Sequence, residues 1–385
     1  MSHKRARCLA DLHLWQPRKL PLALASRTPA EVSWALELLL AASCPADASA
    51  PPDRLDAIAS LPRLPALLPA LLPLAAPAGP AASPLAPHPP RLAHLAALSR
   101  LHRRQAWLLL RNLSLLADNE PSLAASPPLR QLLLSTCRAA LAPHPPPQPS
   151  APHPHPPLLA SDFDPSIHGY AAEVLSNLCR QLKLDEWGPD ALIGGEPCTA
   201  ARLCSLLASL LLSAEPALVL PTIEAFARLA VVEENEVHLM RLIEEEPAVI
   251  TVFANALSGQ AEVGRDTQDA QLAAQFAQEA ALECLYSLSS LSLAPPHSAA
   301  VLSAKAALAR APSLLPRLLG LLQQPTPPHL SRRAAQLLLN LASAPANHAL
   351  FRPYEWVFAY FALHPQAETH TAVAPIAADI LTELG

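Results

Sequence analysis

Apolar residues recur along the chain in blocks whose spacing of three and four positions is typical of amphipathic helices. Each block opens on small residues, continues as a leucine-rich run and closes on a polar residue followed by leucine. This periodicity predicts an all-helical chain with almost no strand. The clearest blocks are Arg103–Leu116, Ala171–Leu182, Ile223–Val232, Glu279–Leu291, Arg332–Ala342 and Ile376–Leu384, and an earlier copy is expected at Val32–Ala42.

The closing leucines of these blocks define a repeat. They are Leu113, Leu178, Leu229, Leu288, Leu341 and Leu384, separated by 65, 51, 59, 53 and 43 residues. The shortest step matches the period of about 40–47 residues found in armadillo and HEAT repeats. A single helical hairpin cannot bury its apolar face, whereas stacked neighbours bury it continuously. We therefore expect an armadillo/HEAT-like, right-handed superhelical solenoid of about six or seven repeats, with Leu113, Leu178, Leu288 and Leu341 buried at the repeat junctions.

Segments between the blocks supply the partner helices. Leu203–Leu212 is apolar nearly all round and is expected to be buried on several sides. Pro247 is expected at the first turn of a helix. Pro312–Leu322 is expected to be a second helix that starts at a proline in the same way. Small residues in the blocks would let neighbouring helices approach closely. They are Ala171, Ala172, Ala280, Ala281, Ala334 and Ala335.

Proline-rich and polar stretches mark the breaks. We expect a basic N-terminal segment over 1–21 and one repeat domain over 22–385, with insertions at about 75–90 and 142–157. The second insertion, Ala142–Pro157, has no large apolar side chain, so it is expected to be extended or disordered. The apolar stretch Leu64–Leu85 holds six prolines and is not expected to span a membrane. Further loops are expected at Pro45–Asp53, Ser258–Asp269 and Gln323–His329.

Composition narrows the functional classes. Only 9 of 385 residues are glycine, too few for many phosphate-binding loops, while 45 are proline. The net charge of −5 argues against nucleic-acid binding driven by overall charge. The seven cysteines are widely spaced without a C-x-x-C pair, which favours buried free thiols in a reducing compartment.

No catalytic, cofactor-binding or metal-ligating motif is present, so we expect no enzyme activity, no cofactor and no small-molecule substrate. His144, His153 and His155 lie in a proline tract without a cysteine or carboxylate partner, so they do not predict a zinc site. Cys198 and Cys204 are spaced unlike a ligand pair on one helix face. The L-x-x-L-L patterns, such as Leu203–Leu207, are interpreted as core packing rather than docking motifs.

Charged clusters offer alternatives. Lys4–Arg7 could serve as a nuclear-import patch, and Arg100–Arg104 is expected to be a solvated face or a partner contact. A local acidic ridge is expected to be a solvated surface, with a basic partner as the alternative. Its members are Glu233, Glu234, Glu236, Glu244, Glu245 and Glu246.

Three ordered segments carry a family resemblance. The first is Leu22–Ser43 followed by Leu55–Leu72, with a tryptophan-alanine-leucine and a leucine-proline-x-leucine-leucine pattern. The second is Ala106–Leu134, which contains leucine-arginine-asparagine-leucine and then asparagine-glutamate. The third is Asn347–Leu363, followed by a final amphipathic helix. Together they resemble the armadillo-like C-terminal core of ARID-containing subunits of SWI/SNF-type chromatin remodellers, including the Osa-like, RSC and PBAF subunits.

The resemblance implies a nuclear, non-enzymatic scaffold subunit that binds other core subunits, among them a Snf-type ATPase. The ARID module that names the family has no counterpart in these segments, so direct DNA binding is not implied. The alternative is a cytosolic armadillo-type adaptor, import carrier or chaperone cofactor that grips partner peptides. An import carrier would line its groove with tryptophan-asparagine pairs. Here Trp107 is followed by Asn112, whereas Trp34, Trp187 and Trp356 have no matching asparagine.

Overall fold

The computed structural model describes residues 19–26, 28–43, 65–77, 90–142, 164–187, 192–193, 195–259, 268–290, 298–323, 327–364 and 368–385. Contacts between α-carbons group the chain into two units. Unit 1 comprises Met1–Leu132 and His144–Val174, and unit 2 comprises Leu133–Pro143 and Leu175–Gly385. The expected insertion at 142–157 and the loop at 45–53 lie outside the described residues, apart from Ala142.

In unit 1, α2 and α3 pack on the long helix α4, and α1 packs on α2 and α3. The side chain of Trp107 on α4 is fully buried, and its Nε1 donates a hydrogen bond of 3.0 Å to the Ala75 carbonyl oxygen at the end of α3. Trp107 therefore belongs to the core of unit 1 and does not line a surface groove. The elements are α1 (Lys19–Leu24), α2 (Pro29–Ser43), α3 (Leu67–Ala75), α4 (Pro90–Ser114), η4 (Ala117–Asn119) and α5 (Glu120–Ala124), while α6 (Pro127–Ala140) and α7 (Pro165–Leu178) contribute residues to both units.

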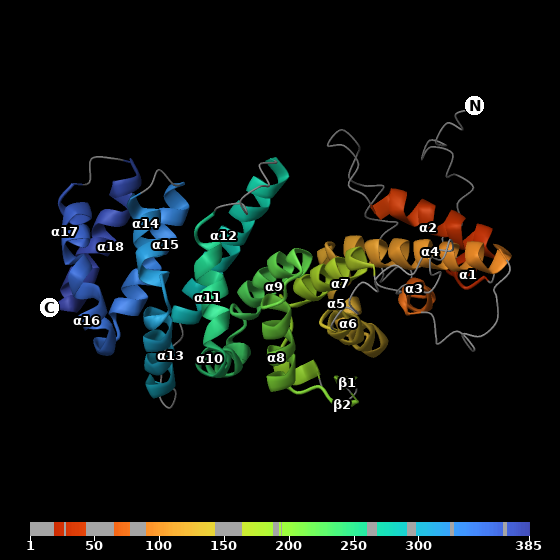
Figure 1. The fold of residues 1–385 in the computed structure, drawn as a ribbon, viewed down its shortest axis with the longest axis horizontal. Helices are drawn as coiled ribbons and strands as arrows, with labels where there is room; N and C mark the ends of the chain where they lie inside the picture. The colour runs from red at the N-terminus through yellow and green to blue at the C-terminus, as the bar shows by residue number, and fades with distance from the viewer. Residues whose placement is uncertain are drawn as a thin grey trace, which may run out of the picture. The chain divides into compact units, whose positions relative to one another are not determined.

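Unit 2 holds the longer run of helices (Figure 1). A short antiparallel pair of two-residue strands precedes them. The elements are η5 (Leu184–Trp187), β1 (Leu192–Ile193), β2 (Glu196–Pro197), α8 (Ala200–Leu211), α9 (Pro216–Leu229), η6 (Glu233–Asn235), α10 (Glu236–Glu245), α11 (Pro247–Ala256), α12 (Gln268–Ser289), α13 (Ser298–Arg310), α14 (Leu314–Gln323), α15 (Pro328–Ala342), η7 (Pro345–Asn347), α16 (His348–Phe351), η8 (Arg352–Tyr354), α17 (Glu355–Leu363) and α18 (Glu368–Leu384).

Three-helix repeats build most of unit 2. The triplets are α10–α11–α12, α13–α14–α15 and α16–α17–α18, and in each the middle helix packs on the third. The third helices form a continuous row, because α9 contacts α12, α12 contacts α15 and α15 contacts α18. This row runs through the green-to-blue part of the chain in Figure 1. The all-α, armadillo-like repeat architecture expected from the sequence is confirmed.

The predicted burial of four closing leucines is also confirmed. Leu113, Leu178, Leu288 and Leu341 expose no more than 3% of their surface. Each lies near the end of its helix, where it packs between neighbouring helices. Of the small residues expected at helix contacts, Ala171, Ala172, Ala281, Ala334 and Ala335 are buried, whereas Ala280 is partly exposed.

A buried asparagine follows three of the closing leucines by six residues. Asn119, Asn235 and Asn347 are each 0% exposed. Their side-chain amides donate to the carbonyl oxygens of Leu113, Leu229 and Leu341 at 3.1, 3.2 and 2.8 Å. Because the last carbonyls of a helix have no partner within it, each amide satisfies one of them and shapes the turn into the next repeat.

Two of these asparagines also reach the preceding repeat. Asn235 donates to the Leu182 carbonyl oxygen at 2.8 Å and accepts from the Leu184 backbone N–H at 2.8 Å. Asn347 donates to the Lys305 carbonyl oxygen at 3.2 Å. A single buried side chain thus joins consecutive repeats by hydrogen bonds.

The sequence predicted that two prolines, Pro247 and Pro312, each begin a helix. Pro247 does begin α11. The prediction that Pro312 begins a helix in the same way is wrong, because Ser313 adopts a φ of 60° and α14 begins only at Leu314. A non-glycine residue in this left-handed region breaks the helical path locally.

Other expectations need smaller corrections. In the apolar segment Leu203–Leu212, most side chains are buried, but Leu212 is 45% exposed. α12 begins at Gln268, so the preceding loop is shorter than expected. None of the described helices is long and apolar enough to cross a membrane.

Candidate functional site

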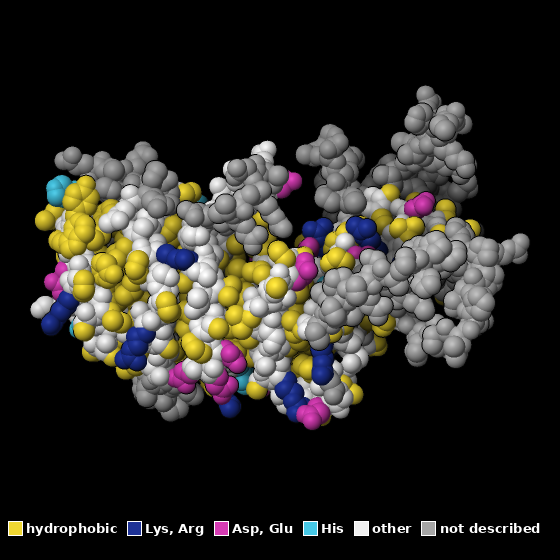
Figure 2. Space-filling model, viewed as in Figure 1, with side chains coloured by type: hydrophobic (Ala, Val, Ile, Leu, Met, Phe, Trp, Pro, Cys, Tyr) yellow, Lys and Arg dark blue, Asp and Glu magenta, His cyan; other side chains and the backbone are white. Residues whose placement is uncertain are grey.

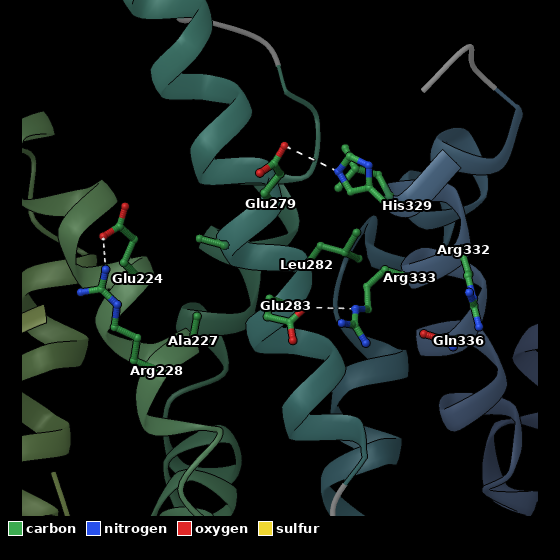
Figure 3. Close-up of a pocket in the computed structure, with 12 residues that line it drawn as sticks. Glu224, Ala227, Arg228, Glu279, Leu282, Glu283, His329, Arg332, Arg333 and Gln336 are labelled. Atoms are coloured by element: carbon green, nitrogen blue, oxygen red, sulfur yellow. Dashed lines mark hydrogen bonds and ion pairs between the residues drawn. The ribbon is translucent and has the colours of Figure 1, made fainter. Parts of the chain in front are cut away.

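The third helices of successive repeats leave a groove on unit 2 with a cavity volume of about 670 Å³. Figure 3 shows side chains from α9, α12 and α15 pointing into it. The groove is open because small residues, Ala227 and Ala280, form part of its floor. The lining residues are Glu224, Ala227, Arg228, Glu279, Ala280, Leu282, Glu283, His329, Leu330, Arg332, Arg333 and Gln336.

The repeat register places equivalent residues side by side in the groove. Glu224, Glu283 and Gln336 each lie five residues before a closing leucine on α9, α12 and α15. The same position in unit 1 is Glu173, which pairs with Arg111. Five residues along a helix do not complete a whole number of turns. This position therefore lies on the side of the helix away from the buried closing leucine and points to solvent.

Arg228 ties the groove floor to the preceding helix. Its Nη1 donates to the Ser176 hydroxyl and to the Asn177 side-chain oxygen, both at 2.8 Å, and its Nη2 lies 3.3 Å from Glu224 Oε2. Ser176 and Asn177 are buried on α7. Three acceptors therefore hold one guanidinium in place. Glu224, on the same helix, is held in position by its ion pair with this guanidinium.

Arg333 makes the corresponding link between α12 and α15. Its Nε lies 3.0 Å from Glu283 Oε2, and its guanidinium carbon lies 4.1 Å from the centre of the Tyr286 ring. A guanidinium at this distance from an aromatic face gains a cation–π interaction in addition to the ion pair. On the same helix, Asn340 Nδ2 donates to the hydroxyls of Ser289 and Ser290 at 3.1 and 2.8 Å.

Two charges in the groove are less well compensated. Glu279 has only His329 nearby, at 3.9 Å, and both side chains are largely exposed. Arg332 is exposed and makes no hydrogen bond or ion pair with the described residues. Figure 3 shows the side chains of Arg332 and Gln336 next to each other on α15, away from Glu283.

The groove was not predicted from the sequence. Its signal is weak: a glutamate lies five residues before three of the closing leucines. Glu173 and Glu283 pair with arginines on other helices, and Glu224 pairs with an arginine on its own helix. The sequence did draw attention to Trp107 and Asn112, which are not a groove pair. Trp107 is buried, and Asn112 donates to the Ser43 hydroxyl at 3.1 Å.

The acidic ridge lies elsewhere on unit 2, in η6 and α10. Two of its charges form ion pairs: Glu234 with Lys183 at 2.6 Å, and Glu245 with Arg241 at 2.6 Å. A hydrogen bond from Lys183 lowers the pKa of Glu234. Most members of the ridge are exposed, and none of them lines the groove.

Described cysteines are free and buried, as expected, while Cys8 and Cys44 lie outside the described residues. Burial raises the pKa of Cys137, Cys179 and Cys204 to about 12, and that of Cys198 to about 11. Protonated thiols of this kind are poor nucleophiles and poor metal ligands. Among the described residues, no group of three or more histidine, cysteine or acidic side chains could hold a metal ion.

A second exposed surface lies on α17. Trp356, Tyr360 and Leu363 are 67%, 49% and 75% exposed, at spacings that place them on one helix face. Figure 2 shows hydrophobic side chains gathered at this end of unit 2. The Tyr360 ring stacks on His364 with centroids 4.8 Å apart.

Comparisons with known proteins give no family. No family model matches the chain, and no curated protein matches its sequence. Among solved structures, crystal structures of Kap121p are similar: one mutant form at 11% identity with a TM-score of 0.31, and one bound to Nup53p at 12% identity with a TM-score of 0.30. A third, bound to Ste12p, is 13% identical with a TM-score of 0.30.

Each of these matches covers 96% of this chain but only 37–41% of the Kap121p chain. Because these TM-scores are near 0.3, the matches carry no argument about the fold. The fold is assigned from the packing of helices within unit 2. On that basis, the chain is an all-α protein with armadillo-like three-helix repeats and an open groove across the third helices of unit 2.

Proposed function

We propose that this protein is a non-enzymatic adaptor that binds a polypeptide segment of a partner protein in the groove over α9, α12 and α15. The observation that supports this proposal is the groove's preorganised floor. Arg228 and Arg333 are held by hydrogen bonds and ion pairs to neighbouring helices before any ligand arrives. These links fix the shape of the groove before a ligand arrives, so little conformational entropy of the groove is lost on binding.

The dimensions of the groove suit a peptide rather than a compact metabolite. Neighbouring packed helices lie about 8–10 Å apart, so three of them span about 20 Å. An extended chain advances about 3.3 Å per residue, so about six residues would cross the groove. Its lining mixes charged and apolar side chains and is open to solvent, unlike the mostly apolar pockets that enclose small molecules.

Filling the groove tests this function. Random peptides displayed on phage would be selected on the immobilised protein and then offered to Ala280→Trp, which places a large ring on the groove floor. We expect the selected peptides to lose binding to this variant. Ala248→Trp, at an exposed position of α11 outside the groove, is the matched control and should bind them normally. Peptides that bind both variants equally would contradict the proposal.

A scaffold role in a SWI/SNF- or RSC-like chromatin remodeller is the second candidate function. One observation favours it: two of the sequence segments that resemble that family form the same structural motif. Ala106–Leu134 contains the buried Asn119 turn, and Asn347–Leu363 begins at the buried Asn347 turn. The resemblance therefore follows a repeated structural feature and not only leucine content.

This second candidate places the protein in the nucleus, bound to other core subunits and a Snf-type ATPase. Affinity purification from nuclear extract followed by mass spectrometry tests it. Recovery of the ATPase and further subunits that persists in moderate salt would support the scaffold, since burial resists screening better than exposed ion pairs do. Recovery of cytosolic chaperones or transport cargo without an ATPase would favour the adaptor in a different setting.

A further inference from the structure

The groove is lined by equal numbers of acidic side chains and arginines, but not all of them are paired with each other. Three glutamates and three arginines line it. Glu224 is paired with Arg228, and Glu283 with Arg333. These four charges are therefore already compensated within the protein. A ligand gains little from them, because it would have to replace an existing partner.

Glu279 and Arg332 remain available to a ligand. The neighbour of Glu279, His329, is 3.9 Å away and carries a charge only when protonated. Arg332 is exposed and makes no ion pair or hydrogen bond with the described part of the chain. Beside it, the Gln336 amide offers two more donors, since a side-chain amide nitrogen carries two hydrogens.

The repeat register fixes how these two charges are placed. Glu279 lies nine residues before Leu288 on α12, and Arg332 lies nine residues before Leu341 on α15. They thus occupy equivalent positions on two helices in contact. Packed helices are about 8–10 Å apart, so the two positions are separated by about one such step along the groove.

We propose that the groove selects an extended peptide with one basic and one acidic side chain about three residues apart. The basic side chain pairs with Glu279, and the acidic one with Arg332 and the Gln336 amide. Three residues of extended chain cover about 10 Å, which matches one helix-to-helix step. This inference rests on the proposed adaptor function and adds the chemistry of the segment that is bound.

The same arrangement disfavours ligands of a single charge sign. A strongly basic peptide that reaches Glu279 would also meet Arg332, about one helix-to-helix step away. A strongly acidic one would meet Glu279. Like charges brought together within a groove repel, and this repulsion contributes to specificity as much as attraction does.

A charge swap tests the inference. Random twelve-residue peptides would be selected by phage display on the full chain and, separately, on the double variant Glu279→Arg with Arg332→Glu. We expect peptides from the natural protein to be enriched in one basic and one acidic residue about three positions apart. Peptides from the swapped variant should carry the same two residues in the opposite order along the chain.

Binding strengths give a second measurement. A selected peptide, synthesised with a fluorescent label, should bind either single variant, Glu279→Gln or Arg332→Gln, about two- to fivefold more weakly, as is usual for exposed ion pairs. The control variant combines Arg241→Glu with Glu245→Arg, which swaps an exposed pair on α10 outside the groove. It should bind like the natural protein.

The outcomes separate this inference from the proposed function. Peptides that lose binding to Ala280→Trp but show neither the charge pattern nor the reversed order would overturn the inference and leave the adaptor function standing. If no selected peptide depends on the groove, the adaptor function fails and the inference fails with it. Circular dichroism melting of each variant checks that the exposed substitutions leave the fold intact.

Discussion

The side-chain amide of Asn235 donates a hydrogen bond of 2.8 Å to the carbonyl oxygen of Leu182, 53 residues earlier in the chain. The same amide bonds the Leu229 carbonyl oxygen, and its oxygen accepts from the Leu184 N–H. Asn235 is 0% exposed, so none of these groups can turn to water instead. One side chain thereby closes the end of α9 and attaches the following repeat to the previous one.

We predict that Asn235→Ala lowers the free energy of unfolding by about 3 kcal/mol, because buried backbone groups lose their partners. Chemical denaturation monitored by circular dichroism measures the change. Asn255→Ala, at an exposed position of α11, is the control and should change stability by less than about 0.5 kcal/mol. Equal effects of the two substitutions would show that the buried amide does not join the repeats.

Leu341 provides a test of the core between repeats. It is 0% exposed, so Leu341→Ala leaves a cavity and should cost about 2–5 kcal/mol. Leu363→Ala removes the same atoms from a side chain that is 75% exposed and should have little effect. The two melting curves, recorded under the same conditions, decide whether stability follows burial as the repeat phasing requires.

Lys305 is a buried cation whose removal should stabilise the protein. It is 5% exposed, and its Nζ donates to the Ser343 hydroxyl at 3.0 Å. Burial lowers its pKa. Because an apolar chain of similar shape carries no desolvation penalty, Lys305→Met should raise the unfolding free energy by about 1 kcal/mol at neutral pH.

The pH dependence of that gain follows from the direction of the shift. A lysine whose folded pKa is lowered destabilises the fold while it is protonated, so the penalty is present at neutral pH. Stability of the natural protein rises as pH increases from the folded pKa toward the unfolded value, and the difference from Lys305→Met shrinks there. Lys183→Met, at a half-exposed surface lysine paired with Glu234, is the control. A gain of equal size in both variants would refute the burial argument.

The thiols of Cys137, Cys179 and Cys204 should resist alkylation in the folded protein. Their pKa values of about 12 leave almost no thiolate at pH 7.5, and burial blocks access. Iodoacetamide labelling followed by mass spectrometry of peptides, with and without urea, measures this. Rapid labelling of any of the three without urea would mean that its surroundings open in the native state.

These thiols also set a pH limit on stability. Their folded pKa values are raised, so the folded state favours the neutral form, and this contribution is complete below the ordinary thiol pKa of about 9. Above that pH the unfolded chain gains thiolate while the folded chain does not, so stability falls as pH rises toward 12. Melting temperatures recorded from pH 7 to pH 11 should decline chiefly above pH 9.

Helices and repeat junctions were accessible from the sequence because they depend on local spacing. The pattern that ends in Leu113, Leu178, Leu288 and Leu341 marks the buried side of each helix, and all four are buried. Pro247 was placed correctly because proline is favoured at a helix start. Pro312 was not, because the backbone conformation of the next residue, Ser313, decides where α14 begins.

The groove could not be derived in the same way. Arg228 finds its acceptors 51 and 52 residues earlier, and Arg333 finds Glu283 on another helix. Such partners depend on how the helices stack, which a local pattern does not contain. The sequence instead drew attention to tryptophans, of which Trp107 and Trp187 prove to be core residues.

The buried asparagines and the groove arginines join helices by different kinds of interaction. Asn235 and Asn347 use neutral hydrogen bonds closed off from solvent, which dissolved salt does not screen. Arg333 and Glu283 are partly open to water, so ionic strength weakens their attraction. A change in ionic strength would therefore alter the charged links across the groove while the hydrogen bonds that join the repeats keep their strength.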